Sequence, residues 1–195
     1  MLQKASTIVL ALLLSISTAQ AANWTVDATH SRAGFRVSHM MVSSVEGSFS
    51  DMNGELDYEV GKLKGLTVKI TIAVDSVDTA NADRDTHLKS PEFFDTTKFP
   101  TMGFVSKKVK PTKSGFDLTG DLTIRGVTRR VTFEATGLTQ SMIDPWGNTR
   151  VGASATTTIN RQDFGVSWNK SLDQGGLVVG DEVELRLDLE FVKAK

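Results

Sequence analysis

Apolar and polar residues alternate with a period of two along most of the chain. In residues 66–74 an apolar side chain stands at every second position, with Thr67, Lys69 and Thr71 between them. Residues 183–191 repeat the pattern with charged residues at the intervening positions. A strand with this pattern carries its apolar side chains on one face, whereas a helix would scatter them around its circumference. Both segments are therefore predicted to be half-buried β-strands.

Similar alternating rows recur along the chain and are separated by turn-forming residues. They lie at residues 35–49 (with a kink expected at 43–44), 116–124, 131–135 and 151–159. Asn53 and Gly54 are predicted to form a two-residue hairpin turn, because both residues tolerate a positive φ. About eight strands of this kind, joined by turns, predict an antiparallel barrel or sandwich.

The alternation stops between residues 74 and 102. Residues 79–89 are polar and predict a short helix. Ser90, Pro91 and Glu92 match the N-cap and the first two positions of a further helical turn. The predicted fold class is therefore all-β with a short helical insertion around residues 79–95. A connection of this length within a β protein is usually functional.

The first 21 residues have the pattern of a secretory signal peptide. Lys4 precedes a short apolar run at residues 8–16, and Ala19, Gln20 and Ala21 match the small-x-small pattern that precedes a cleavage site. The run is too short to span a bilayer. We expect cleavage after Ala21 and export to the periplasm, with residues 22–195 forming a single barrel domain.

Composition excludes several classes of function. The chain has 22 Lys and Arg against 23 Asp and Glu, so it lacks the basic surplus that binds nucleic acid. It has no Cys, which excludes a thiol nucleophile and a Cys-type zinc site, and it has no glycine motif for dinucleotides or phosphates. With one Tyr and three Trp it lacks the aromatic girdles of membrane-spanning barrels, so we expect a protein that does not span the membrane.

The three histidines are the chain's candidate metal ligands and catalytic bases. His30, His39 and His87 have no metal-ligand spacing, so no metal site is predicted. His39 is in register with Phe35 and Val37 and is expected to point inward, where its ring needs a hydrogen-bond partner. Two sets of residues could form a Ser-His-Asp triad, although neither has a nucleophile-elbow motif. The sets are Asp27, His30 and Ser31, and Asp85, His87 and Ser90.

The interior of the barrel and its polar insertion each allow two interpretations. Small residues on the inner rows leave room for a cavity, unless bulky neighbours fill that room; these residues are Gly47, Gly120, Ala153 and Ala155. The cluster around Arg84 and His87 is either a solvated helix face or a polar gate in which Arg84 receives an anionic head group. The sequence leaves both alternatives open.

An ordered series of motifs resembles a known family from about Trp24 to about Phe191. The motifs are Trp24-x-x-Asp27-x-x-His30-Ser31, Phe35-x-Val37-x-His39-Met40, Gly47-x-Phe49, Ser76-Val77-Asp78-Thr79, Arg84-Asp85-x-His87-Leu88-x-Ser90, Phe99-Pro100, Gly120-Asp121-Leu122-Thr123-Ile124-Arg125-Gly126-Val127-Thr128 and Arg161-x-Asp163-Phe164-Gly165. The chain resembles the YceI family of periplasmic, lipocalin-like polyisoprenoid-binding proteins. The resemblance implies an extended eight-stranded antiparallel barrel with an elongated apolar pore, no catalytic activity, and binding of isoprenoid quinones or prenyl phosphates.

The resulting hypothesis is an exported protein that holds a long-chain isoprenoid lipid in its barrel, with no cofactor. The residues expected to line the barrel are Phe35, Val37, Met41, Val68, Ile70 and Ile72. The residues expected near the head group are His39, Arg84 and His87. Two alternatives stay open, namely a structural or stress-response protein with a filled barrel and a secreted hydrolase that uses a histidine. A homodimer through an exposed strand edge also stays open.

Overall fold

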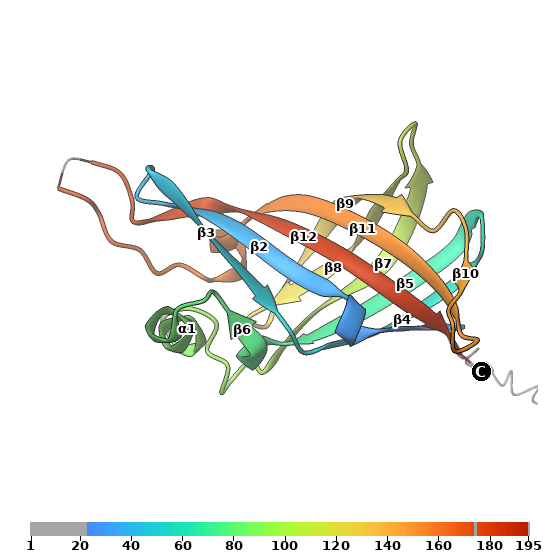
Figure 1. Ribbon diagram of the computed structural model, residues 1–195. Coiled ribbons are helices and arrows are strands. Elements are labelled where there is room, and N and C mark those ends of the chain that lie inside the picture. The colour runs from blue at the N-terminus through green and yellow to red at the C-terminus, as the bar shows by residue number, and fades with distance from the viewer. Residues whose placement is uncertain (1–22, 174, 195) are drawn as a thin grey trace, which may run out of the picture.

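The computed structural model describes residues 23–173 and 175–194, most of which lie in β-strands (Figure 1). The predicted signal peptide and its cleavage site after Ala21 lie outside the described residues. The strands are β1 (Trp24–Val26), β2 (Arg32–His39), β3 (Ser43–Phe49), β4 (Met52–Glu59), β5 (Lys62–Ala73), β6 (Val77–Asp78), β7 (Thr101–Pro111), β8 (Phe116–Ile124), β9 (Val127–Gly137), β10 (Met142–Ile143), β11 (Thr149–Asn160) and β12 (Val179–Lys193). The helical elements are η1 (Ala28–His30), η2 (Val74–Ser76), α1 (Ala82–Lys89) and η3 (Arg161–Phe164).

The strands close into an antiparallel barrel of eight strands, as predicted. The hydrogen-bonded order runs β11-β9-β8-β7-β5-β4-β1-β12, and β12 pairs again with β11 to complete the ring. Along the other edge of β12, β2 pairs with residues 183–188 and β1 with residues 191–193. The short η1 turn thus interrupts what is in effect one long strand of the barrel. The all-β prediction is confirmed.

Burial follows the predicted alternation. In β5 the side chains of Leu66, Val68 and Ile70 are buried, while Thr67 and Lys69 between them are exposed. Burying an aliphatic side chain of this size contributes about 1.5–3 kcal/mol relative to leaving it in water. Because a shift of one residue would turn this whole row outward, the apolar pattern also determines the strand register.

The predicted hairpin at Asn53 and Gly54 is wrong, because both residues lie inside β4. Asn53 pairs with Thr71 and Gly54 with Ile70 of β5. A Cβ atom added at Gly54 would lie 2.7 Å from the carbonyl oxygen of Lys69. Glycine is therefore present because the neighbouring backbone approaches closely, and not because the chain turns.

The turn between β2 and β3 comes earlier than predicted. Strand β2 ends at His39, and the next two residues, Met40 and Met41, have φ values of 50° and 61°. Met41 is 73% exposed, so the prediction that it continues the inward-facing row is wrong. The pattern predicts an inward-facing Met41 because residues 40–42 contain none of the Gly, Pro, Asn or Asp that usually mark a turn.

The insertion forms one short helix, α1, followed by turns. Asn81 is its N-cap and accepts a hydrogen bond from the Arg84 amide at 2.9 Å. Ser90, predicted as an N-cap, is instead the C-cap, and its amide donates to the carbonyl of His87 at 3.1 Å. Pro91 then follows the helix end, where proline is common because it cannot continue the helix.

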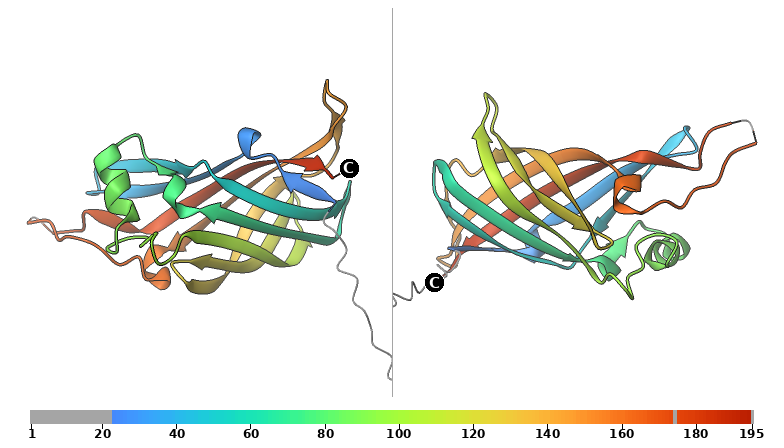
Figure 2. Two further views of the ribbon diagram at one scale, coloured as in Figure 1. Left: turned by 90° about the horizontal axis from the view of Figure 1, so that it is seen from below. Right: turned by 180° about the vertical axis from the view of Figure 1, so that it is seen from behind.

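The helix lies at one end of the barrel and the described chain termini lie at the other (Figures 1 and 2). The amide of Ala194 donates to the carbonyl of Asn23 at 2.9 Å, which holds the two termini together. We call these the α1 end and the β1 end. Among the described residues, none of the helices has the length and apolar character needed to cross a membrane.

Candidate ligand-binding cavity

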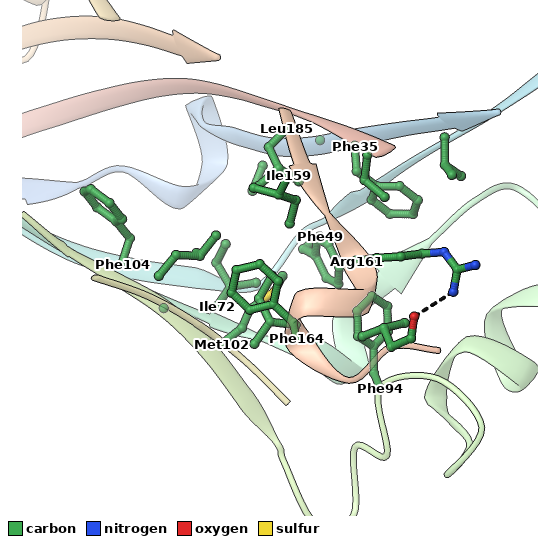
Figure 3. A pocket seen from close by; sticks show the side chains of 18 of the residues that line it. Phe35, Phe49, Ile72, Phe94, Met102, Phe104, Ile159, Arg161, Phe164 and Leu185 are labelled. Carbon is green, nitrogen blue, oxygen red and sulfur yellow. Dashed lines mark hydrogen bonds between the residues drawn. The ribbon is translucent and has the colours of Figure 1, made fainter. Parts of the chain in front are cut away.

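The barrel contains an apolar cavity of about 150 Å³ toward its α1 end, which we call the larger cavity. Strands β2, β5, β7 and β12 supply much of its wall, while the chain after α1 and η3 supply further side chains (Figure 3). Its aromatic residues are Phe35, Phe49, Phe93, Phe94, Phe104, Phe133 and Phe164. Apolar cavities of roughly this volume contain no water and can bind a molecule the size of benzene. The larger cavity therefore suits an apolar group and offers almost no polar contact to it.

Arg161 lines the larger cavity, but its charged end is turned away and fully engaged (Figure 3). The guanidinium donates to the carbonyls of Gly180 at 2.8 Å, Val166 at 2.6 Å and Trp168 at 2.9 Å, and it pairs with Asp181 at 3.2 Å. The side chain is only 5% exposed, and this burial lowers its pKa, an effect that Asp181 partly offsets. Arg161 thus fastens the connection between η3 and β12 to the end of the barrel.

A second apolar cavity of about 50 Å³, the smaller cavity, lies toward the β1 end. Leu56, Phe116 and Phe191 are among its wall residues. Beyond it, Trp24 closes the barrel at 1% exposure, and its indole nitrogen donates to the carbonyl of Tyr58 at 2.9 Å. The β1 end is therefore sealed by large side chains that project from the strands themselves.

The α1 end is covered by side chains from two connections between strands. The His87 ring packs edge-to-face against Phe93 at 4.9 Å and against Trp168 at 5.0 Å, measured between ring centroids. Arg125, at the turn between β8 and β9, donates to the carbonyls of Pro91 and Gly165 and so ties both connections to the barrel. Aromatic contacts of this kind add about 0.5–1.5 kcal/mol each beyond the area they bury.

The predicted lining residues fall into three places. Phe35, Val37, Ile70 and Ile72 line the larger cavity, and Ile70 also borders the smaller one. Val68 lines the smaller cavity alone. Met41 is exposed in the turn after β2 and lines neither. Their contact with a lipid stays a prediction.

The three predicted head-group residues do not form one cluster. His39 is half-buried at the end of β2 and lines neither cavity. Arg84 donates to the Thr79 hydroxyl at 2.8 Å and to the Thr79 carbonyl at 2.7 Å, and His87 contacts the Glu92 carboxylate. A head group that used Arg84 or His87 would have to displace these partners.

Two of the small inward-facing residues leave less room than predicted. A Cβ atom at Gly47 would overlap the Phe35 ring, and one at Gly120 would overlap the Phe104 ring. These glycines therefore accommodate aromatic rings from neighbouring strands rather than empty space. Of the predicted small residues, Ala153 and Ala155 do line the smaller cavity.

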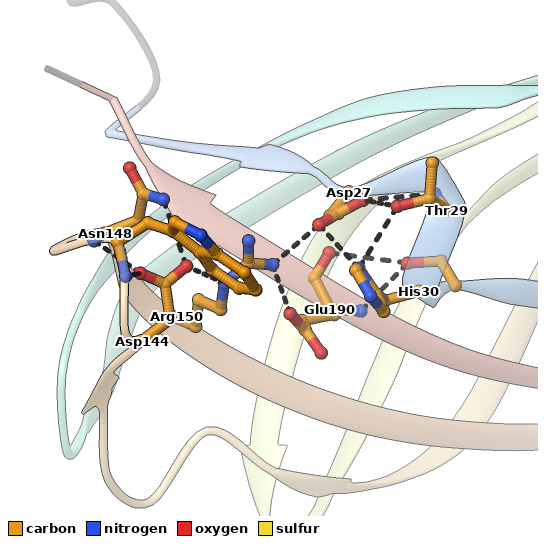
Figure 4. A network of polar contacts seen from close by, with 9 residues as sticks. Asp27, Thr29, His30, Asp144, Asn148, Arg150 and Glu190 are labelled. Carbon is orange, nitrogen blue, oxygen red and sulfur yellow. Dashed lines mark hydrogen bonds and ion pairs between the residues drawn. The ribbon is translucent and has the colours of Figure 1, made fainter.

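A polar network at the β1 end brings together Asp27, His30 and Glu190, each of which offers one possible metal-ligand atom, and these atoms all lie within 4.8 Å of one another (Figure 4). Such a group resembles a cation site, but Arg150 already supplies the positive charge. Its guanidinium contacts Asp27 at 2.6 Å, Asp144 at 2.7 Å and Glu190. The network is therefore an ion-pair cluster that joins β1, β11, β12 and the turn after β10.

The network shifts the pKa values of its members. Hydrogen bonds from Thr29 and Arg150 hold the pKa of the Asp27 carboxyl well below its usual range. Desolvation opposes ionisation of Asp144, but hydrogen bonds from Asn148 and Arg150 outweigh it and also hold the Asp144 pKa well below its usual range. The carboxylates raise the pKa of Arg150 in turn, with Asp27 having the largest effect.

Neither candidate triad is assembled in the structure. His30 does contact Asp27 at 2.9 Å, but the Ser31 hydroxyl oxygen accepts a hydrogen bond from the Glu190 amide at 2.9 Å instead of facing the histidine. In the second set, Asp85 accepts from Thr79 and His87 pairs with Glu92. The remaining member, Ser90, caps α1. These polar residues are accounted for by turns and caps.

Sequence reasoning missed several residues that line the larger cavity. Phe93, Phe94 and Phe164 come from segments without alternation, so no strand pattern pointed to them. Phe49 stood in a recognised alternating row but was not singled out. A usable indication was available for the first three, because apolar aromatic residues within an otherwise polar insertion must find a buried partner.

The fold and the cavity define the class of this protein as a lipocalin-like β-barrel, an architecture that encloses one small or elongated ligand. The family model described as the YceI-like domain matches residues 24–191. The chain therefore belongs to the YceI-like domain family, which confirms the resemblance inferred from its motifs.

Named relatives and solved structures agree with this assignment. A UPF0312 protein of Staphylococcus aureus strain MSSA476 is 37% identical over 171 residues, covering 87% of this chain and 96% of the relative. A UPF0312 protein of Pseudomonas fluorescens is 37% identical over 191 residues, covering 94% and 93%. The crystal structure of Burkholderia cenocepacia BcnA matches with a TM-score of 0.73 and 25% identity, covering 85% of this chain and 98% of that one.

A further structural match shares the fold at low sequence identity. It is described as a polyisoprenoid binding domain from Saccharophagus degradans implicated in plant cell wall breakdown. It is 15% identical, has a TM-score of 0.63, and covers 89% of this chain and 99% of that one. At this identity the match supports the common barrel architecture.

Proposed function

We propose that this protein is an exported carrier that binds an isoprenoid lipid, such as an isoprenoid quinone or a prenyl phosphate, with the apolar tail inside the barrel. The observation that carries the proposal is the larger cavity, whose walls are apolar and whose one charged residue, Arg161, directs its guanidinium to backbone carbonyls. The polyisoprenoid-binding description of the Saccharophagus degradans relative supports the same ligand class.

The apolar walls imply that affinity comes from burial of the tail. Removing apolar surface from water contributes about 25 cal/mol per Å², so a prenyl chain binds without needing a hydrogen bond. A charged or strongly polar head group would lose its hydration in this cavity without compensation. The head group is therefore placed outside, at the α1 end, near the predicted contacts His39, Arg84 and His87.

The cavity volume limits how much of a tail fits the structure as it stands. About 150 Å³ holds roughly the carbon atoms of one aromatic ring. A longer chain therefore needs displacement of side chains that cover the α1 end, such as Phe94 and Trp168. These side chains come from connections rather than paired strands, so they move without breaking the barrel's hydrogen bonds.

The periplasm is the proposed location. The signal-peptide pattern of residues 1–21 supports it, with cleavage expected after Ala21. Expression of the full chain in a bacterial host tests this point. The mature protein should begin at Ala22 and appear in the periplasmic fraction, whereas an intact N-terminus in the cytoplasm would contradict it.

The decisive experiment is to identify what co-purifies with the protein. After expression in a host that makes quinones, the purified protein should be extracted with organic solvent and the extract analysed by mass spectrometry. An isoprenoid lipid at a near-stoichiometric amount is the expected result. No lipid in the extract, together with no binding when isoprenoids are titrated into the protein, would contradict the proposal.

The same preparation separates the two alternatives. A filled structural barrel would bind no isoprenoid, and the two cavities already weigh against that interpretation. A hydrolase would require a histidine, so replacing His30, His39 and His87 with Ala would abolish turnover. A carrier with that triple substitution should keep most of its affinity, because the tail contacts are apolar.

A further inference from the structure

The larger and smaller cavities are separated by one layer of side chains. Four residues line both cavities, and they come from four strands around the barrel. These residues are Ile70 of β5, Phe104 of β7, Phe133 of β9 and Leu187 of β12. The two cavities thus lie end to end inside the barrel, and this layer of side chains separates them.

Two aromatic rings form the centre of this layer. Phe104 and Phe133 pack edge-to-face, with ring centroids 5.2 Å apart and ring planes at 78°. They are 6% and 2% exposed. An edge-to-face pair with this spacing has the geometry that aromatic rings prefer, so each ring helps to hold the other over the inner face of β8, the strand between them.

Gly120 allows the Phe104 ring to take this position. Gly120 lies on β8, the strand between β7 and β9, and pairs with Ser106 on one side and Val131 on the other. A Cβ atom at Gly120 would overlap both the Phe104 ring and the carbonyl oxygen of Val105. A glycine in the middle of a strand weakens the strand, and the space it frees here is occupied by the ring that divides the two cavities.

We propose that Phe104 and Phe133 form a partition that sets the length of the apolar chain the barrel accepts. This inference rests on the proposed function. A chain that enters from the α1 end fills the larger cavity and meets the paired rings with its far end. Within the described residues, the β1 end is occupied by the buried Trp24 side chain, which is 1% exposed.

The volumes give the expected consequence of opening the partition. Beyond the rings lie only about 50 Å³ of further space, a third of the larger cavity. Each additional buried methylene improves the dissociation constant by about fourfold, equivalent to about 0.8 kcal/mol. Joining the cavities therefore benefits only chains that are long enough to reach the smaller one.

The test measures dissociation constants for a series of isoprenoid alcohols, namely prenol, geraniol, farnesol and geranylgeraniol, in one mild detergent. For the wild-type protein, affinity should rise with chain length and then level off. In the Phe104→Leu and Phe133→Leu variants, affinity should keep rising to a longer alcohol before it levels off. The first alcohol beyond the wild-type limit should bind about tenfold more tightly to these variants than to wild type, while prenol, which fits within the larger cavity, changes little.

Phe116→Leu is the matched control. Phe116 is a buried phenylalanine, 3% exposed, that lines the smaller cavity but does not border the larger one. This substitution enlarges the smaller cavity without opening the layer, so the wild-type length limit should persist. Circular dichroism checks that each variant folds, and the two partition variants test the same layer independently.

The outcomes separate the partition from the proposed function. If wild-type and partition variants bind the alcohols but level off at the same length, or if wild-type affinity rises through geranylgeraniol, the partition is refuted and the carrier function stands. If Phe116→Leu extends the limit as far as Phe104→Leu does, the limit is a matter of total volume and the partition is also refuted. If no alcohol binds to any variant, the proposed function fails and the partition fails with it.

Discussion

At the β1 end, Trp24 and Phe191 project into the barrel from paired strands, whereas at the α1 end Phe93 and Trp168 come from connections between strands. A side chain on a paired strand cannot leave the interior unless the strand turns over or separates. A side chain on a connection can swing out while every barrel hydrogen bond stays intact. The same kind of residue is therefore held by paired strands at one end and by connections, which open at a lower free energy, at the other.

This difference bears on where the proposed lipid would enter and on where stability resides. Segments with few ladder hydrogen bonds open locally at a lower free energy than paired strands. Arg161 and Arg125 fasten the cover at the α1 end through hydrogen bonds to backbone carbonyls. The β1 end instead combines buried aromatic residues with the ion-pair network around Arg150.

The largest expected effect is on stability, from removing one tryptophan at each end. Trp24→Ala should lower the free energy of unfolding by about 3–5 kcal/mol, because it leaves a cavity and deprives the Tyr58 carbonyl of its donor. Trp168→Ala should cost about 1–2 kcal/mol, because that side chain is partly exposed on a connection. Urea denaturation measures both. Equal losses would show that the two ends are closed in the same way.

The second prediction concerns Arg161, the fastener of the cover. Arg161→Met keeps the apolar stem but leaves buried carbonyls without a donor, and should cost about 2–4 kcal/mol in urea denaturation. Arg161→Lys should recover part of this loss, because lysine keeps the charge but lacks the planar fork. Arg186→Met is the control, since the Arg186 side chain is 54% exposed and pairs with Glu184 at the surface. If Arg186→Met lowers the free energy of unfolding as much as Arg161→Met does, the hydrogen bonds of Arg161 have no special role in holding the cover in place.

The third prediction is a pH dependence that belongs to the β1 end. The folded protein holds the pKa values of Asp27 and Asp144 well below the unfolded value of about 3.9. Their contribution to stability is therefore complete above about pH 5 and is lost as the pH falls through the folded pKa values. The denaturation midpoint of wild type should decrease between about pH 5 and pH 3, and that of Arg150→Gln should decrease less. Identical slopes for the two proteins would show that the network does not govern acid stability.

The smallest expected effect compares two residues that the sequence placed on one inward-facing row. Val37→Ala should weaken binding of farnesol by about fivefold, because Val37 lines the larger cavity. Met41→Ala should leave the dissociation constant within about twofold and the stability within about 0.5 kcal/mol, because Met41 is exposed in a turn. Titration calorimetry measures the affinities. If both substitutions weaken farnesol binding equally, Met41 contacts the ligand after all.

The strands and their buried faces could be predicted because period-two alternation is a local property. Val68, Ile70 and Ile72 are buried as the pattern of residues 66–74 requires. The same reasoning failed at Met41, where a turn without the usual turn residues ended the row early. It also failed at Gly54, where glycine is needed because the neighbouring strand approaches closely and not because the chain turns.

By itself the sequence determined the all-β class, the helical insertion and the family, since alternation, polar interruptions and motif order are all written along the chain. Closure of the barrel decided the rest. Phe93 and Phe164 reach the larger cavity only because their connections fold over the α1 end, and Phe104 divides the interior only because Gly120 lies beside it on β8. Such contacts depend on strand register and on the path of the connections, which bring residues distant in sequence to within a few ångströms. No periodicity along the chain encodes that proximity.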